Sequence, residues 1–233
     1  MATFQELFDV CAFPTFEKQM RLSSLIGEQH WLLDAESATL TFGDVVFPVQ
    51  FLGTESELTH TWLWADANPK AMLPAASLQF CRRARDKGCK LGLEEFQSDH
   101  FAFVEEVGKP TGHTLVMVAT CLAGASCYYR CPHENGAVFV ALSDSRVDQQ
   151  PDLDREGFLA AFNNLMWIPG DTKKRVVSYL SAKGYIAKNF AGTELKCKLY
   201  TGEEIGLSFE PASDGGMRIK FLAERKLTES TAK

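Results

Sequence analysis

The sequence lacks the short motifs that identify the common enzyme classes. It contains no GxSxG nucleophile elbow, no GxxxxGK[ST] phosphate loop, no GxGxxG dinucleotide fingerprint and no HExxH zinc motif. Hydrolases with that elbow, P-loop nucleotidases, Rossmann dehydrogenases and HExxH metalloproteases are therefore set aside. We predict no catalytic residue, no metal and no cofactor, and we expect a protein that is not an enzyme.

Long apolar runs and an excess of positive charge are also missing. No stretch approaches the ~18 apolar residues that a membrane span requires, and no basic segment followed by an apolar run opens the chain. We therefore expect no membrane partner and no secretory signal. The formal net charge of −6 has the wrong sign for a general nucleic-acid binder. The seven cysteines follow no paired pattern, so we expect reduced thiols and a cytoplasmic location.

Charge and composition divide the 233 residues into two parts. Residues 1–150 carry 19 acidic and 11 basic side chains, whereas residues 151–233 carry 11 acidic and 13 basic ones. The polar stretch SDSRVDQQPDLD separates the two parts and predicts a linker at 144–151. We therefore predict one domain at 1–143 and a smaller unit at 152–226.

Hydrophobic periodicity predicts an α+β fold. The expected helices of the first domain lie before Gly27, with an interruption at Pro14, and at 71–87 and 111–123. The expected strands lie at 39–42, 45–52, 58–65, 126–131 and 136–142, whereas 89–110 fits no pattern. Two helices and three alternating strands follow in the second unit. We expect a mainly antiparallel sheet packed with helices, plus a smaller C-terminal αα-βββ unit.

The most distinctive segment is TWLWADANP at 61–69. Together with Trp31 and the strand at 38–42, it resembles an uncharacterised bacterial family, a domain of unknown function. Members of that family have a leading helix, a strand meander that ends in a TWxWAxANP segment, and a late Tyr-Arg-x-Pro-His hairpin, here at 129–133. The resemblance covers about residues 3–143. It implies a fold and a bacterial origin, and it brings no catalytic residues.

The tryptophan segment supplies the first candidate binding site. Alternate side chains of a strand share a face, which places His60, Trp62 and Trp64 in one row. Such a row could line a ligand slot or form an interface hot spot, or it could pack beneath a helix. Asp66 and Asn68 follow where Asn68-Pro69 should end the strand and cap the next helix. These five residues are the predicted site.

Cysteine and histidine gather in the region of the late hairpin. Cys121, Cys127, Cys131 and His133 include the ligand types that zinc prefers. Their spacing is not the CxxC pattern of structural zinc sites, so we expect buried thiols and no metal. Cys131 could also form a thiolate–imidazole pair with His133 or His113, the arrangement of a cysteine nucleophile.

The last strands offer a secondary basic face. Alternation places Lys196, Lys198, Arg218 and Lys220 on the wet side of the C-terminal sheet. Such a face could contact an acidic protein or a phosphate-rich partner. Neighbouring glutamates instead favour an ordinary solvated surface.

These observations rank three classes of function. We expect first a non-catalytic bacterial protein-binding module, an immunity or antitoxin-like inhibitor or an adaptor, whose acidic side chains match a basic partner protein. The first alternative is a small-ligand-binding protein that uses the face of His60, Trp62 and Trp64. The second is an enzyme of unrecognised type, a hydrolase built around Cys131, His133 or Asp66.

Overall fold

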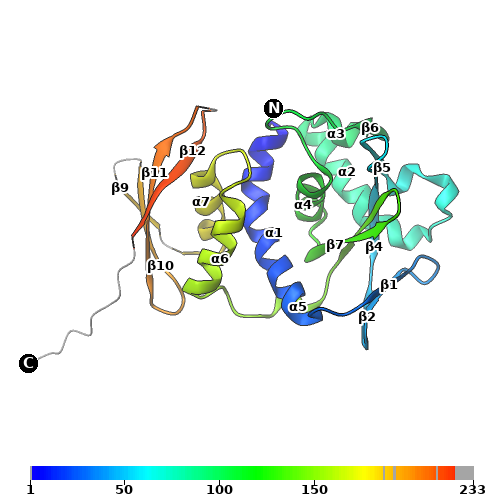
Figure 1. Cartoon of the computed structure of the whole chain (residues 1–233), viewed down its shortest axis with the longest axis horizontal. Coiled ribbons are helices and arrows are strands. Elements are labelled where there is room, and N and C mark those ends of the chain that lie inside the picture. Colours follow the sequence, from blue (N-terminus) through cyan, green and yellow to red (C-terminus); the bar gives the residue numbers. More distant parts are fainter. Residues whose placement is uncertain (1, 186, 191–192, 214, 224–233) are drawn as a thin grey trace, which may run out of the picture. The chain divides into compact units, whose positions relative to one another are not determined.

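A computed structural model describes residues 2–185, 187–190, 193–213 and 215–223. The chain divides into two compact units, 1–150 and 151–233. Both units combine helices with antiparallel sheet, which confirms the predicted α+β class (Figure 1). Among the described residues, no helix has the length and apolar character needed to cross a membrane.

The main sheet of the first unit has five antiparallel strands in the order β6-β5-β4-β8-β7. The strands are β4 (Gln50–Ser56), β5 (Thr61–Trp64), β6 (His100–Ala102), β7 (Cys127–His133) and β8 (Gly136–Leu142). The predicted β7–β8 hairpin is present, and it turns just before Gly136. Almost every β8 side chain is buried, so both faces of the sheet are covered at this central strand and the usual alternation of buried and exposed residues is lost.

A second sheet of three antiparallel strands precedes the main one. It consists of β1 (Trp31–Asp34), β2 (Thr39–Phe42) and β3 (Val45–Pro48). The single strand predicted at 45–52 is therefore wrong, because Pro48 ends β3 and the chain then enters β4 of the other sheet. Tyr129 of β7 contacts both sheets, since its ring packs edge-on against Phe42 at a centroid distance of 4.8 Å.

Helices α1 (Phe4–Ile26), α2 (Gln79–Leu91) and α4 (Gly112–Ala123) pack on the main sheet. Helix α4 contacts α1 and α2 as well as β4 and β7, which explains why it is apolar on every side, as predicted.

Two of the predicted helices differ from those in the structure. Pro14 lies inside one continuous α1 and does not interrupt it. The helix expected at 71–87 begins only at Gln79, after short 3-10 turns.

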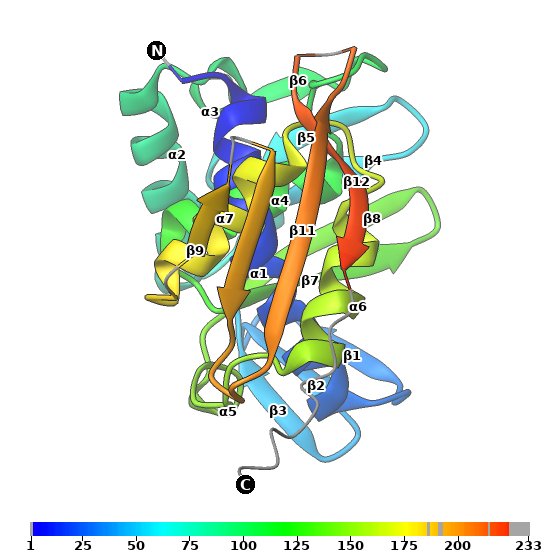
Figure 2. The same cartoon turned by 90° about the vertical axis from the view of Figure 1, so that its left-hand side faces the viewer.

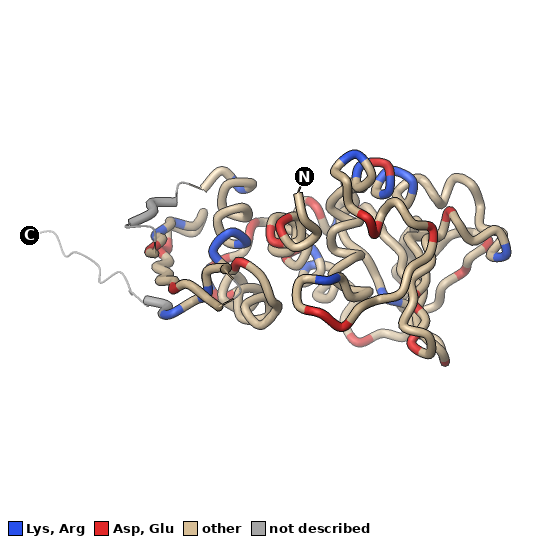
Figure 3. The backbone as a smooth tube through the Cα atoms, turned by 90° about the horizontal axis from the view of Figure 1, so that it is seen from above, with Lys and Arg blue, Asp and Glu red and all other residues tan. Residues whose placement is uncertain are grey.

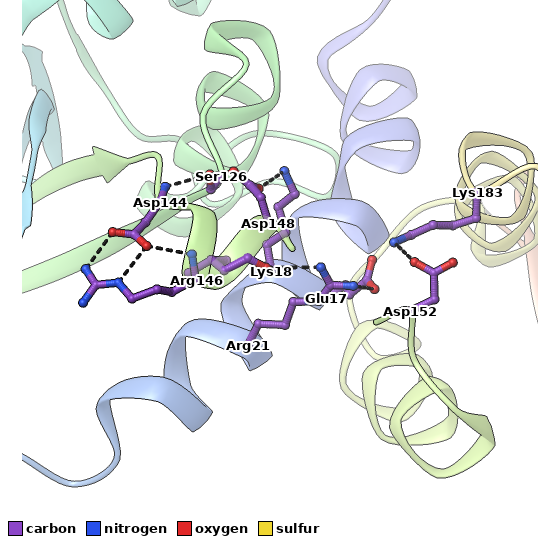
Figure 4. A network of polar contacts seen from close by, with 10 residues as sticks. Glu17, Lys18, Arg21, Ser126, Asp144, Arg146, Asp148, Asp152 and Lys183 are labelled. Carbon is purple, nitrogen blue, oxygen red and sulfur yellow. Dashed lines mark hydrogen bonds and ion pairs between the residues drawn. The ribbon is translucent and has the colours of Figure 1, made fainter. Parts of the chain in front are cut away.

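The predicted linker at 144–151 holds a short helix, α5 (Ser145–Asp148), which belongs to the first unit. Its Val147 is fully buried, and Arg21 of α1 donates a hydrogen bond to the Val147 carbonyl at 3.2 Å. Asp148 accepts a hydrogen bond from Ser126 at 2.6 Å and pairs with Lys18 at 2.8 Å (Figure 4). The polar composition concealed this helix, because only one of its side chains is apolar.

In the described part of residues 151–233, two helices accompany a four-stranded antiparallel sheet in the order β12-β11-β10-β9 (Figure 2). Its elements are α6 (Arg155–Leu165), α7 (Thr172–Ala182), β9 (Ala187–Phe190), β10 (Glu194–Lys198), β11 (Glu204–Pro211) and β12 (Met217–Ala223). Strand β9 was not predicted, so the αα-βββ description lacks one strand. The alternation of β10 and β11 is as expected, with Leu195, Leu207 and Phe209 buried.

Candidate binding site

The tryptophan row is part of the hydrophobic core. Trp62 and Trp64 have no exposed surface, and their rings meet edge-to-face at a centroid distance of 5.3 Å. The Trp64 indole donates to the Glu95 carbonyl at 2.9 Å, and the Trp62 ring packs on Phe139. Gly53 makes room for Trp62, because a Cβ at position 53 would lie 2.3 Å from the indole. Of the alternatives that the sequence left open for the row of His60, Trp62 and Trp64, the structure therefore has the two tryptophans packed in the core, and they form no open binding face.

The backbone conformation of His60 keeps its side chain out of the row formed by the two tryptophans. It lies in the turn between β4 and β5 with a φ of 50°, is exposed, and precedes the first residue of β5. A residue with this left-handed conformation does not continue the alternation of the following strand. The row predicted from period-two spacing therefore begins at Trp62 and does not include His60.

Asp66 and Asn68 have structural partners at the end of β5. Asp66 lies in the middle of the 3-10 turn η1 (Ala65–Ala67) and accepts a hydrogen bond from Arg85 at 2.8 Å. Arg85 also donates to Asp99 at 2.6 Å. Burial lowers the pKa of Arg85, but the hydrogen bonds that Arg85 donates to the two carboxylates outweigh burial, so the net shift is upward. The Asn68 side chain caps neither adjoining turn, contrary to expectation.

The cysteines and histidines of the hairpin do not meet as a metal site. Within the described ranges, no group of three or more Cys, His, Asp or Glu side chains is placed to hold a metal ion. Burial raises the pKa of the Cys131 thiol to about 12, which disfavours the thiolate form that a cysteine nucleophile uses. His133 is exposed at the end of β7, and its Nδ1 accepts from the Asn135 amide at 3.3 Å.

A polar cluster lies at the start of α4 instead. Glu55 of β4 accepts a hydrogen bond from the Gly112 amide in the first turn of α4, and its Oε2 lies 3.8 Å from Arg130 Nε. Arg130 also pairs with Glu57, while His113 and the Tyr128 hydroxyl are 3.2 Å apart. Residues 55 and 130 are 75 positions apart in the sequence, so no local pattern indicates their proximity.

The electrostatics of this cluster follow from partial burial. Burial raises the pKa of Glu55, although Arg130 opposes the shift. Burial, followed by the charge of Arg130, lowers the pKa of His113. Gly112 is needed for the close approach, because a Cβ there would lie 2.6 Å from a Glu55 oxygen. The cluster holds the start of α4 against the sheet and contains a neutral imidazole.

A hollow of about 190 Å³ lies beside β6, between helix α3 (Glu94–Gln97) and the segment that leads into α4. Phe101 and Phe103 contribute apolar surface to it, and Lys109 and Pro110 line it from the α4 side. The lining residues lie within 94–98 and 101–110. We call these two segments the β6 surface. They fall in the stretch that fitted no sequence pattern.

The β6 surface is apolar, acidic and open along one edge. Val104 is 56% exposed and Val107, three residues later, is 70% exposed, so the segment presents two apolar side chains to solvent. Glu94, Glu105 and Glu106 of the same two segments are exposed as well, against the single cation Lys109. Strand β6 is an edge strand, since it pairs with β5 alone in the main sheet.

The secondary basic face of the second unit is a mixed surface. Lys196 and Lys198 are exposed on β10, but Glu204 of β11 is the direct cross-strand partner of Lys198. Glu210 is likewise paired with Arg218 and lies 4.0 Å from Lys220. Positively and negatively charged positions lie close together along this backbone (Figure 3). The glutamates dilute the positive potential that a phosphate-rich partner would need.

Comparisons with known proteins reach only the first unit. A family model described as a family of unknown function (DUF6882) matches residues 5–145. No curated protein and no solved structure matches the chain. The matched segment ends before the boundary at residue 150 and contains both the tryptophan core and the β6 surface.

Proposed function

Since the chain belongs to DUF6882, a family of unknown function, we propose its role from its own geometry: a non-catalytic module that binds a basic, extended segment of another protein at the β6 surface. One observation carries the proposal. An apolar hollow, an exposed edge strand and a rim of glutamates occur together within residues 94–110.

The size of the hollow favours a side chain as its occupant. Pockets for small molecules usually measure roughly 300–1,000 Å³, and this one measures about 190 Å³. A single aliphatic or aromatic side chain of a partner fits such a space. Val104 lines the hollow, and the exposed Val107 lies three residues further along the chain, where it would contact the neighbouring part of the partner.

The edge strand gives the occupant its conformation. A sheet edge offers unpaired backbone groups to another chain, and an added peptide strand gains main-chain hydrogen bonds there. Residues His100 and Ala102 of β6 are exposed on this edge. An extended segment that pairs with β6 would place alternate side chains toward the hollow.

Charge selects a basic partner. The exposed Glu94, Glu105 and Glu106 outnumber Lys109, and residues 1–150 as a whole carry 19 acidic and 11 basic side chains. Such a field accelerates the encounter with a basic segment and disfavours acidic ones. We place this partner among bacterial cytoplasmic proteins, with the chain acting as an immunity or antitoxin-like inhibitor or as an adaptor.

The test uses the full chain and two synthetic peptides of equal length, one alternating lysine with valine and the other alternating glutamate with valine. We expect calorimetry to detect the lysine peptide only, with an affinity that falls as salt rises. Val107→Asn removes the apolar contact without changing the charge, and it should weaken binding roughly tenfold, which is about 1.4 kcal/mol. Leu32→Asn is the matched control, because Leu32 is 68% exposed on β1 and Val107 is 70% exposed.

Two outcomes would count against the proposal. Equal binding of both peptides would remove the charge argument, and equal effects of the two asparagine variants would place the contact elsewhere. Affinity capture from the native lysate then identifies the natural partner. A genuine partner should be retained by Leu32→Asn, recovered in smaller amount with Val107→Asn, and contact the chain through a basic segment.

A further inference from the structure

Trp167 is the most exposed aromatic side chain among the described residues of the second unit. It lies in the turn between α6 and α7 and is 79% exposed, and Pro169 of the same turn is exposed as well. Tryptophan is highly buried on average in folded proteins, and it is among the residues most enriched at the centres of protein interfaces. An indole with so little contact contributes little to the core, and it is available to a partner.

Two arginines hold the turn between α6 and α7 in one conformation. Arg175 of α7 is only 1% exposed. Its Nη1 donates to the Leu165 carbonyl at 2.7 Å and to the Ile168 carbonyl at 2.8 Å, and its Nη2 donates to the Pro169 carbonyl. Arg218 of β12 donates to the same Ile168 carbonyl at 3.3 Å. A buried guanidinium is costly unless its donors are bonded, so these carbonyls are kept in place. The indole is therefore presented from a preorganised turn, which lowers the entropic cost of docking it.

The turn also lies in a basic part of the chain. Residues 163–175 contain Lys173, Lys174 and Arg175 against one acidic side chain, Asp171. Arg218 adds a further positive charge through its hydrogen bond to the turn. An exposed indole among basic side chains is complementary to an acidic surface that contains an apolar hollow.

The β6 surface has both properties. Its hollow of about 190 Å³ takes one large side chain. The rings of Phe101 and Phe103 lie edge-to-face at a centroid distance of 5.5 Å and give the hollow an aromatic wall, against which an indole packs well. The exposed glutamates of this surface supply the opposite charge. The chain therefore carries both a hollow and a side chain that fits it.

We propose that Trp167 of one copy of the chain docks in the β6 hollow of a second copy. This inference rests on the proposed function, since it names an occupant of the same site. The turn fills the hollow without adding a strand to β6, whereas an extended basic segment uses both the hollow and the strand edge. Self-association is therefore the weaker interaction, with concentrations on the order of 0.1–1 mM needed, and the partner segment displaces the indole.

Analytical ultracentrifugation of the full chain tests the docking at about 10 μM and at about 1 mM. We expect the sedimentation coefficient to rise with concentration, and the rise to become smaller as salt increases. Trp167→Ala lacks the indole, and Val104→Asn places a polar side chain in the lining of the hollow, so each should remain monomeric. Tyr200→Ala is the matched control and should associate like the wild type, because Tyr200 is also exposed, at 54%, in the same unit.

A mixture of the two variants tests whether the contact joins different copies. Trp167→Ala keeps the hollow and Val104→Asn keeps the indole, so an equimolar mixture should associate although neither variant does so alone. Association of either variant by itself, or a mixture that stays monomeric, would overturn the proposal. A wild-type chain that is monomeric at every concentration would overturn it as well.

The lysine–valine peptide separates this inference from the proposed function. Dilute Trp167→Ala should bind the peptide with the affinity of the wild type, and excess peptide should dissociate the associated wild-type chain. Peptide binding by a wild-type chain that never associates would overturn only the docking of Trp167. Association that requires both Trp167 and Val104, in a chain that binds no peptide, would instead overturn the proposed function.

Discussion

At the scale of single residues, the core depends on Gly53, a glycine whose role no sequence pattern indicates. A Cβ added to Gly53 would lie 2.3 Å from Trp62 and 2.7 Å from the Leu63 carbonyl. Gly53→Ala must therefore displace a buried indole or a strand, and we expect a loss of about 1–3 kcal/mol in the free energy of unfolding. Urea denaturation measures it. Trp62→Phe removes the crowded ring atoms, so the double variant should recover part of the loss; two losses that simply add would contradict the contact.

His113 gives a residue-scale prediction for pH. Its folded pKa is lowered by partial burial and then by Arg130, from an ordinary value of 6.5. Below pH 6.5 the unfolded chain therefore binds the proton first, and the stability that His113 contributes is lost as the pH falls. We expect His113→Gln to reduce the loss of stability between pH 7 and 5, measured by urea denaturation at each pH. Glu55, whose raised pKa changes the stability in the opposite direction, contributes in both proteins, so its contribution cancels in the comparison. An unchanged dependence of stability on pH in His113→Gln would contradict the lowered pKa of His113.

At the scale of elements, the sequence predicted those with strong periodicity or clear turn residues. Helix α4 and the β7–β8 hairpin are found within a few residues of their predicted positions. Three-residue β6 was missed, because it is too short to display a period and is defined by its pairing with β5. The same reason explains the missed candidate site. The β6 surface arises where α3, β6 and the start of α4 converge, and no spacing within 89–110 encodes that convergence.

The tryptophan segment shows the opposite case. Its alternation was correctly seen, and Trp62 and Trp64 do share one buried side of β5. Sequence alone left two alternatives for that side, a ligand slot or a core. Phe96 of α3 and Phe139 of β8 decide between them, because they pack on the two indoles from distant parts of the chain.

The cap of α4 links an element to the proposed binding surface. Thr111 caps the helix and accepts from the Thr114 amide at 3.3 Å, directly after Lys109 and Pro110 of the hollow. Thr111→Ala should cost about 1 kcal/mol of stability and also weaken the lysine–valine peptide. Thr3→Ala is the matched control, because Thr3 forms the same capping box at α1. Calorimetry should find peptide binding weakened in Thr111→Ala only. Equal affinities of the two variants would mean that the start of α4 does not contribute to peptide binding.

At the scale of the whole molecule, charge and family membership divide the chain near one position. The acidic excess lies in residues 1–150, the family model matches 5–145, and the first compact unit is 1–150. Helix α5 closes this unit, since it is held by Ser126, the residue before β7, and by Lys18 and Arg21 of α1. A truncation after residue 143 would remove the buried Val147, so the useful boundary follows Gln150.

We therefore predict that residues 1–150 fold alone and keep the lysine–valine peptide affinity of the full chain. A unit with its own core unfolds as one cooperative transition. The fragment retains three of the four tryptophans, including the buried Trp62 and Trp64, and loses Trp167, which is 79% exposed. Its fluorescence should consequently shift to shorter wavelength than that of the full chain and move to longer wavelength in one step with urea. A fragment ending at residue 143 is the control and should be less stable. A gradual transition for 1–150, or folding without the peptide affinity, would mean that residues 151–233 are needed for the first unit to act.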